Sequence, residues 1–394
     1  MQASPKQRRD QRAGVYIHVP FCARLCPYCD FAVSIKAEIP HRAYAEALLA
    51  EFAMRAQELE GRDVRTIYVG GGTPSLWDRG ELSRVLDVVR ERLGVAEDVE
   101  VTLETNPNQV DEAALREWKA AGINRLSIGC QSFQPRMLQA LRRNHSAEVA
   151  IEAVERALSS IGNVSLDVMY GGPDQGLEEW ERDLDQLARF EGLGHVSAYN
   201  LTVEPNTAFW TRRKRGSLRV TDEDTCAMMM ELLVERCTAL GIEQYEVSSF
   251  AREGARSQHN SNYWVGGEYL GLGMGAHGLQ IDAVRGVLRR NNARKLAHYM
   301  RVPLEAAEIE EVSAHAHLLE RLFLGVRTGV GLDFDEVCHQ FEHAVDAALL
   351  EGAAKVLEVM VAEELLVFDG VYRPTAAGFQ LADSLAERIY DALG

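Results

Sequence analysis

Short β-rich apolar runs alternate with longer amphipathic runs through the first half of the chain. The β-rich runs, predicted as strands, are residues 15–21, 66–69, 99–105, 125–130, 164–170 and 195–202. The runs with helical spacing between them are residues 41–60, 79–93, 111–121, 135–142, 147–160 and 177–190. Repeated β-then-α units predict parallel strands joined by right-handed crossovers, and therefore an α/β fold with a partial, TIM-like (β/α)6 barrel.

The pattern changes near residue 300. Helices are predicted at 314–326, 334–342, 344–362 and 375–391, with a hairpin turning at Asp369-Gly370 before the last helix. Helices followed by a hairpin resemble a winged-helix module. Four parts are therefore expected: a mobile polar tail, the barrel, a connecting region, and a mostly helical winged-helix-like domain. Their boundaries are 1–14, 15–220, 221–300 and 301–394.

The charge balance narrows the class of partner. The chain has 394 residues, with 59 acidic and 42 basic side chains, and a formal charge of −17. This disfavours binding to nucleic acid, which needs a basic face, and the acidic composition of 334–370 disfavours DNA binding by the C-terminal module. No apolar run reaches the ~20 residues of a membrane span, and the basic start lacks the apolar segment of a secretory signal. We therefore expect a cytoplasmic protein without an integral membrane segment.

Three of the seven cysteines are clustered at Cys22, Cys26 and Cys29. Three thiolates in one loop can hold three irons of a [4Fe–4S] cluster and leave the fourth open to a ligand. A zinc site would want a fourth ligand, which is not nearby in the sequence, and structural thiols are the other alternative. The remaining cysteines are expected to be small apolar core residues. They are Cys130, Cys226, Cys237 and Cys338.

Polar and glycine-rich segments follow the predicted strands. The segment 70–74 (GGGTP) follows the second strand, Glu104 ends the third, Gln131 follows the fourth, and Asp167 lies late in the fifth. Working residues of such barrels lie at the C-terminal ends of the strands, so these four features predict one ligand spread across the sheet. Taken singly, a glycine run is more often a turn, and each carboxylate is equally well a capping or exposed group.

The CxxxCxxC spacing resembles the motif of the radical S-adenosylmethionine superfamily, in which S-adenosylmethionine chelates the open iron. Further motifs, from YIHVPFCARLCPYCDF to HNSNYW, resemble the coproporphyrinogen dehydrogenase-like branch in matching order, from residue 15 into the C-terminal module. The resemblance implies a [4Fe–4S] cluster and S-adenosylmethionine as cofactors. It also implies which residues contact S-adenosylmethionine, namely Tyr16, Tyr28, Gly71, Gly72, Thr73, Glu104, Gln131, Arg143, Asp167 and the backbone near Leu201. Without it, Arg143 is equally well a solvated helix residue.

Within this branch the sequence departs from the dehydrogenase in two ways. The dehydrogenase has a further cysteine at the position of Phe31, and it has a longer N-terminal arm than this chain. Both departures favour its heme-chaperone relatives, whose motif ends in CDF. The segment 259–264 matches their HNxxYW motif, which is associated with heme binding, and implies heme contact by His259. A structural turn, with the aromatic side chains of Tyr263 and Trp264 in the core, is the alternative. Other candidate heme ligands are His18, His145 and His277.

Two further segments carry weaker signals. The run 266–278 (GGEYLGLGMGAHG) lacks the Lys-Ser/Thr of a phosphate loop, so we expect an irregular loop over the barrel mouth. The basic run 212–215 is expected to be a solvated loop.

The function expected from the resemblance is that of a heme chaperone. It would bind heme, a [4Fe–4S] cluster and S-adenosylmethionine, deliver heme to an acceptor protein, and form a homodimer. No catalytic residue is assigned. The alternative is an oxygen-independent coproporphyrinogen III dehydrogenase.

Overall fold

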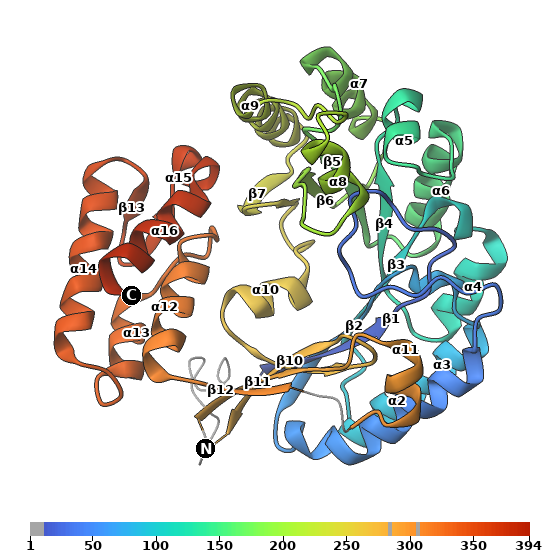
Figure 1. Cartoon of the computed structure of the whole chain (residues 1–394), viewed down its shortest axis with the longest axis horizontal. Coiled ribbons are helices and arrows are strands. Elements are labelled where there is room, and N and C mark those ends of the chain that lie inside the picture. Colours follow the sequence, from blue (N-terminus) through green and yellow to red (C-terminus); the bar gives the residue numbers. More distant parts are fainter. Residues whose placement is uncertain (1–11, 283–285, 305–307) are drawn as a thin grey trace.

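The computed structural model describes residues 12–282, 286–304 and 308–394. A single twelve-stranded sheet crosses the molecule in the order β12-β11-β10-β9-β1-β2-β3-β4-β5-β6-β8-β7 (Figure 1). Its strands are β1 (Arg12–Val19), β2 (Asp63–Gly71), β3 (Glu100–Thr105), β4 (Arg125–Gln131), β5 (Val164–Tyr170), β6 (His195–Asn200), β7 (Glu243–Glu246), β8 (Ser249–Ala251), β9 (Glu268–Leu272), β10 (His277–Asp282), β11 (Gly286–Asn291) and β12 (Glu308–Val312). The six predicted strands are present as β1 to β6, and they pair in parallel.

Helices connect and cover these strands. The helices of the barrel region are α2 (His41–Arg55), α3 (Arg79–Leu93), α4 (Glu112–Ala120), α5 (Pro135–Ala140), α6 (Ala147–Ser160), α7 (Leu177–Leu187), α8 (Ala208–Lys214), α9 (Glu223–Ala239), α10 (Gln258–Trp264) and α11 (Leu296–Arg301). The described residues also form three short 3-10 helices, η1 (Ala56–Leu59), η2 (Pro74–Leu76) and η3 (Pro107–Gln109). The linear strand order leaves the barrel open between β12 and β7, so the prediction of a partial barrel is confirmed.

Side-chain alternation explains which face of the sheet is functional. In β1, Val15, Ile17 and Val19 are fully buried in the main core, whereas Tyr16 and His18 point to the opposite, inner face. The same alternation repeats in the neighbouring strands, where apolar residues pack under the helices and polar residues face inward. The inward polar residues include Thr66, Thr102, Glu104, Ser127, Ser165, Asp167 and Ser197. The inner face of the sheet is therefore polar, which is unusual for a packed barrel and suits a bound ligand.

Two expected boundaries differ from the structure. Residues 1–11 of the predicted tail lie outside the described residues, and Arg12 already begins β1, three residues before the expected boundary at 15. The expected connecting region, 221–300, supplies β7 and β8 at one edge of the sheet and β9 to β11 at the other. It therefore extends the same sheet in both directions.

The run 266–278, expected to be an irregular loop, is largely strand. Its residues form β9, which pairs in parallel with β1 through contacts such as Tyr16 with Gly271. Leu270 and Leu272 are buried in the main core, so packing overrides the loop preference of the glycines. The sheet thus gains a seventh parallel strand beside the cysteine loop.

The C-terminal module is mostly helical and has its own apolar core. It contains α12 (Ala314–Gly325), α13 (Phe334–Phe341), α14 (Ala347–Ala362), the hairpin β13 (Leu366–Phe368) and β14 (Tyr372–Pro374), α15 (Ala376–Gln380) and α16 (Ala382–Leu393). The expected last helix is thus divided at Leu381. The module lies beside the barrel, with α10 on the side of the barrel that faces it (Figure 1). Contacts from Gly329 N to the Tyr245 carbonyl (2.9 Å) and from Arg289 to Glu320 (2.5 Å) join the two parts.

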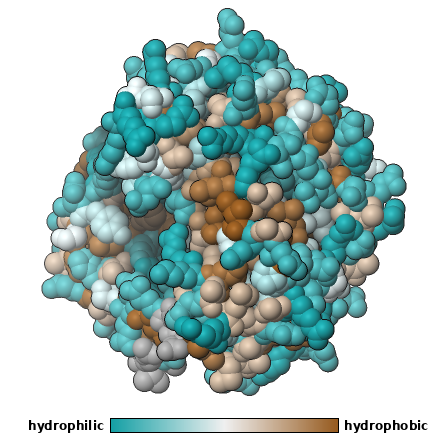
Figure 2. Space-filling view, turned by 45° about the vertical axis from the view of Figure 1, so that its right-hand side comes forward, coloured by the Kyte–Doolittle hydropathy of each residue, from teal (hydrophilic) through white to brown (hydrophobic). Residues whose placement is uncertain are grey.

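Most of the face in Figure 2 is hydrophilic, but hydrophobic residues gather near its centre beside a hollow. Within the described residues, no helix is long and apolar enough to span a bilayer.

Candidate cofactor site

The three clustered cysteines lie on the loop between β1 and α2. Hydrogen bonds between Cys22 N and the Ser34 carbonyl (3.2 Å) and between Ser34 N and the Pro20 carbonyl (2.7 Å) close its base. Its far side is held by Tyr28, whose ring packs against Phe209 at 6.4 Å between centroids. The loop is thus fixed at both ends, at the C-terminal edge of the parallel strands.

The thiols lie close enough to influence one another. Burial, which outweighs a hydrogen bond from Thr73 (3.7 Å), raises the pKa of Cys22 to about 11, with smaller upward contributions from Cys29 and Cys26. Burial likewise raises the pKa of Cys29. Within the described ranges, no three His, Cys, Asp or Glu side chains already stand in metal-binding geometry.

Arg143 lies in this site and is not a solvated helix residue. Its Nη1 is 3.8 Å from the Cys26 sulfur, and its Nη2 donates to the Gly129 carbonyl (2.6 Å) and to the side chain of Asn106. Asn106 in turn donates to Thr73 Oγ1 (3.2 Å). The buried Nε of Arg143 has no partner, so this cation keeps hydrogen-bonding capacity next to the cysteine loop.

The glycines of the 70–74 segment allow a close approach of two chain segments. A Cβ at Gly71, where φ is +119°, would lie 2.6 Å from the His18 ring, and a Cβ at Gly72 would lie 2.8 Å from the Phe21 carbonyl. Their N–H groups donate to Glu104 Oε2 (2.9 Å) and to the Val19 carbonyl (2.8 Å). The glycines thus bring β2 close to the cysteine loop, and the N–H groups of Gly71 and Gly72 are hydrogen-bonded within the protein.

Two carboxyl groups lie on the inner face. Glu104 accepts hydrogen bonds from Tyr68 OH (2.8 Å) and Gly71 N, and burial, with a smaller contribution from Asp167, raises its pKa to about 7. Asp167 accepts from Ser127 and Ser165, both within 3.0 Å, and burial raises its pKa too. Both groups gain from a bound cation, because a positive charge offsets the burial of a carboxylate.

The strand ends around these carboxyl groups are irregular. Gln131 adopts φ of +68°, and the pairing of β4 with β5 shifts register between Gly129 and Gln131. Positive φ at a non-glycine residue and bulges are typical of functional sites. Leu201 is buried and donates its N–H to the Tyr170 carbonyl (2.8 Å), so its backbone carbonyl is the part left for a ligand. Tyr199, which lies on the same inner face of β6 as Ser197, is 42% exposed.

Tyr16, from the centre of β1, points into the same inner face. Its OH lies 2.9 Å from His18 Nδ1, and the other His18 nitrogen lies 2.8 Å from the Ala32 carbonyl. Both ring nitrogens of His18 are therefore engaged, and burial lowers its pKa to about 4. The structure thus brings the three cysteines and every residue predicted to contact S-adenosylmethionine to the inner face and the C-terminal strand ends.

The HNxxYW motif adjoins this site from the N-terminal side of the strands, where the His259 ring stacks on Tyr16 at 6.4 Å and on Tyr68 at 5.0 Å between centroids. It forms α10, which packs against the N-terminal halves of β1 and β2, where a Cβ at Gly14 would lie 3.0 Å from the His259 ring. Gly14 precedes Val19, where the cysteine loop begins, by five residues, or about 17 Å of extended strand. The motif therefore lies toward the opposite end of the strands from the cysteines.

His259 is 1% exposed, and both of its ring nitrogens are occupied. Nδ1 lies 2.7 Å from Thr66 Oγ1 and Nε2 lies 2.6 Å from Tyr263 OH. The backbone N–H of His259 donates to Glu100 (3.0 Å), the ring stacks on Tyr68 at 5.0 Å, and burial lowers the pKa of the ring to about 3. In this arrangement His259 has no free ring nitrogen for the predicted contact with heme.

The other histidines differ from one another. His145 is buried, with Nε2 3.0 Å from the Cys130 carbonyl. His277 is exposed at the start of β10.

The remaining predictions concern the other cysteines and the basic run. Cys130 and Cys237 are buried as expected, whereas Cys226 and Cys338 are partly exposed. The basic run forms the exposed end of α8 rather than a loop.

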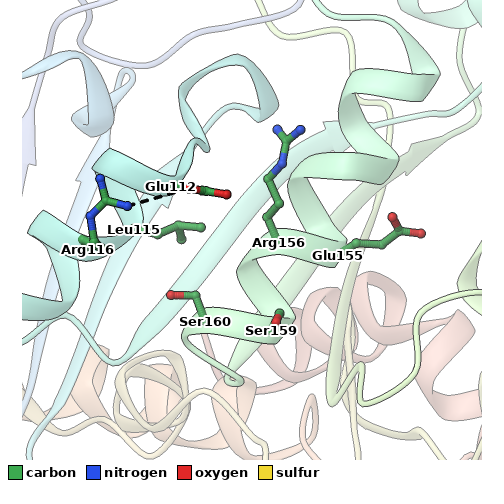
Figure 3. Close-up of a pocket in the computed structure, with 7 residues that line it drawn as sticks. All are labelled: Glu112, Leu115, Arg116, Glu155, Arg156, Ser159 and Ser160. Carbon is green, nitrogen blue, oxygen red and sulfur yellow. Dashed lines mark ion pairs between the residues drawn. The ribbon is translucent and has the colours of Figure 1, made fainter.

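One surface pocket lies apart from all these residues. It is on the outside of the sheet between α4 and α6, and the side chains that line it include an ion pair between Arg116 and Glu112 at 3.7 Å (Figure 3). Its lining is Glu112, Leu115, Arg116, Glu155, Arg156, Ser159 and Ser160. It contains no residue of the predicted site.

Two residues of the site were not predicted. Asn106 connects Thr73 to Arg143, and Tyr68 connects the glycine segment to Glu104. Asn106 follows Glu104 in the ETNP segment, so its position beside an assigned residue was the available signal. Tyr68 lies within an apolar strand and gives no sign of its role, because the alternation of β2 only becomes informative once its inner face is known.

The residues at the strand ends fit the cofactors that the motif implies. Three thiols on one loop match the iron ligands of a cluster with one open position. Carboxyl groups with raised pKa values match an ammonium or sulfonium group, and the unpartnered Nε of Arg143 matches a carboxylate. Cluster, carboxylate and cation are the three elements needed to hold S-adenosylmethionine on iron.

This fold and donor set define a radical S-adenosylmethionine protein, and the model of the Radical SAM superfamily matches residues 16–187. The chain is 40% identical to the heme chaperone HemW of Escherichia coli, over 73% of this chain and 75% of that protein. It is 33% identical to the heme chaperone HemW of Lactococcus lactis, over 95% and 96%. The chain therefore belongs to the HemW family of the radical SAM superfamily.

A solved structure has the same fold. The coproporphyrinogen III oxidase HemN of Escherichia coli, described as a radical SAM enzyme, aligns with a TM-score of 0.80 at 22% identity, covering 97% of this chain and 90% of that one. This likeness confirms the predicted barrel with its helical C-terminal part.

Proposed function

We propose that this protein is a heme chaperone that binds a [4Fe–4S] cluster and S-adenosylmethionine and delivers heme to an acceptor protein. The observation that carries the proposal is the identity to HemW chaperones over nearly the whole chain, 33% over 95% of its length in one case. Phe31 supports it, because this exposed apolar side chain occupies the position where the dehydrogenase has a further cysteine.

In this proposal, Cys22, Cys26 and Cys29 hold the cluster. Tyr16, Tyr28, Gly71, Gly72, Thr73, Glu104, Gln131, Arg143, Asp167 and Leu201 form the S-adenosylmethionine pocket. When bound and reduced, such a cluster would supply an electron to S-adenosylmethionine. The contribution of the protein is charge: Arg143 beside Cys26 meets a carboxylate, and Glu104 and Asp167 meet a cation.

The acceptor is a heme-binding protein, and a homodimer is the proposed assembly. The surface available to an acceptor is acidic overall, since the formal charge is −17. We propose that the winged-helix-like module, residues 301–394, meets protein rather than DNA for the same reason.

A second candidate function is oxidation of coproporphyrinogen, favoured by the fold shared with HemN at a TM-score of 0.80. One cluster-loaded anaerobic sample distinguishes the two functions. Titration with hemin is expected to give saturable one-to-one binding. Incubation with S-adenosylmethionine, a reductant and coproporphyrinogen is expected to give no protoporphyrinogen. Product formation without heme binding would overturn the proposal.

A further inference from the structure

We propose that His277 is the axial ligand of the heme iron, in a site on the rim of the barrel formed with Phe31, Arg294 and Lys295. The proposal rests on the proposed heme-chaperone function and names the site for the cargo. It differs from the prediction based on the HNxxYW motif, which places the heme at His259.

The first step is the state of the imidazoles. An axial ligand needs a ring nitrogen with an accessible lone pair. His18 and His259 have both ring nitrogens engaged inside the protein. His277 is exposed and its ring makes none of the hydrogen bonds found among the described residues. Burial, together with Arg294 and Arg289, lowers its pKa, so the ring is neutral and suited to bind iron.

The second step is position. His277 begins β10 and pairs with Asn291 of β11. Its carbonyl is packed against Gly271, the β9 residue that pairs with Tyr16 of β1. His277 shares a face with Leu279, which pairs with Tyr269, and Tyr269 contacts Tyr263 of α10. This face is the inner face of the sheet, so His277 extends the site surface beyond β1.

The third step is the cysteine loop, which lies against the same segment. A Cβ at Gly275 would lie 2.5 Å from Ala32, and Arg294 Nη2 donates to the Asp30 carbonyl (2.9 Å). Phe31 lies between these two anchored residues and is 63% exposed. A large exposed aromatic ring at a fixed place is a surface on which a porphyrin plane can pack.

The fourth step is charge. Arg294 and Lys295 are exposed and adjacent, directly after β11. Heme carries two propionates, and a chain with a formal charge of −17 repels a dianion over most of its surface. Two neighbouring cations beside a free imidazole and an exposed aromatic ring therefore match the iron, the macrocycle and the propionates of one heme.

The test is heme titration of the cluster-loaded full chain with His277→Ala, His259→Gln and the control His339→Ala. His339 lies on α13, and its side chain is 87% exposed. Soret absorption and the electron paramagnetic resonance of the ferric heme report ligation, and thermal melting reports folding. The His277→Ala protein is expected to lack the spectrum of ligated heme and to bind heme at least about tenfold more weakly than wild type. Added imidazole is expected to restore the spectrum. His339→Ala is expected to match wild type.

Two results would overturn the proposal. One is a His277→Ala protein with the wild-type spectrum and affinity; the other is loss of ligation in a His259→Gln protein that still melts like wild type. A second variant tests the cations separately. Arg294→Glu with Lys295→Glu is expected to weaken heme binding at least about tenfold without changing the ligated spectrum, and unchanged affinity would contradict the site. If wild type itself binds no heme, the proposed function fails, which is a different outcome.

Discussion

The two ends of the parallel strands carry similar residue types in opposite states. Toward the N-terminal end, His259 is enclosed by Thr66, Tyr263 and Glu100, and each polar atom of the ring has a partner. At the C-terminal end, Arg143 keeps a buried nitrogen without a partner, Gln131 has positive φ, and His277 is exposed. A satisfied polar group stabilises a fold, whereas an unsatisfied one is available to a ligand. His259 is therefore enclosed by its partners, whereas Arg143 and His277 keep groups that a ligand can reach.

The largest expected effect is on the cluster. Replacing any one of Cys22, Cys26 or Cys29 with serine should remove the [4Fe–4S] cluster, because only two of its irons would then keep a thiolate ligand from the protein. The matched control is Cys338→Ser, in the C-terminal module, which should keep it. Iron and acid-labile sulfide per chain measure the outcome. A Cys26→Ser protein with wild-type iron content would rule out this ligand set.

The next effect contrasts two histidines. His259→Ala removes a buried ring and leaves two hydroxyl groups without partners, so it should lower the free energy of unfolding by about 3 kcal/mol. His277→Ala, at an exposed position, should change it by less than about 0.5 kcal/mol. Urea unfolding of the cluster-free proteins measures both. Equal values for the two variants would remove the distinction between the ends.

A smaller contrast concerns two glycines with positive φ. Gly71→Ala should destabilise by about 3 kcal/mol, because its Cβ would lie 2.6 Å from His18 in addition to the strained backbone. Gly61→Ala has open space around the Cβ and should cost about 1 kcal/mol from the backbone alone. The same unfolding measurement applies. A Gly71→Ala protein as stable as Gly61→Ala would mean that β2 does not need this close approach.

The last expected effect is the pH dependence from Glu104. Its pKa is raised by burial from 4.5 to about 7, so the folded cofactor-free protein binds this proton more tightly than the unfolded chain does. The associated stability is present below pH about 4.5 and is lost as the pH rises through about 7. Glu104→Gln should therefore flatten the change in urea midpoint between pH about 5 and about 8. An unchanged slope would assign the effect to another group, such as Asp167.

Much of the C-terminal end could be predicted from the sequence, because its residues follow the ends of strands that alternate regularly with helices. Glu104, Gln131 and Asp167 belong to three successive strands, so local patterns and parallel topology suffice to bring them together. The strand β9 was missed because its glycines resemble a loop. This segment is a strand because it pairs with β1, about 250 residues earlier in the sequence, and because Leu270 and Leu272 are buried.

The surroundings of His259 could not be predicted for a similar reason. The ring partner Thr66 is 193 residues away, and the carboxylate that binds its N–H belongs to Glu100. A local sequence motif does not indicate whether its histidine is buried among protein groups or accessible to a ligand. The same limit hid the exposure of His277, which depends on the position of β10 relative to the cysteine loop.

The most direct test of the difference between the two ends is the location of iron in a crystal of the cluster-loaded protein with heme bound. An anomalous difference map at the iron edge is predicted to place the heme iron within ligand distance of His277, on the same rim as the cluster held by Cys22, Cys26 and Cys29. A heme iron peak beside His259 instead would contradict the account.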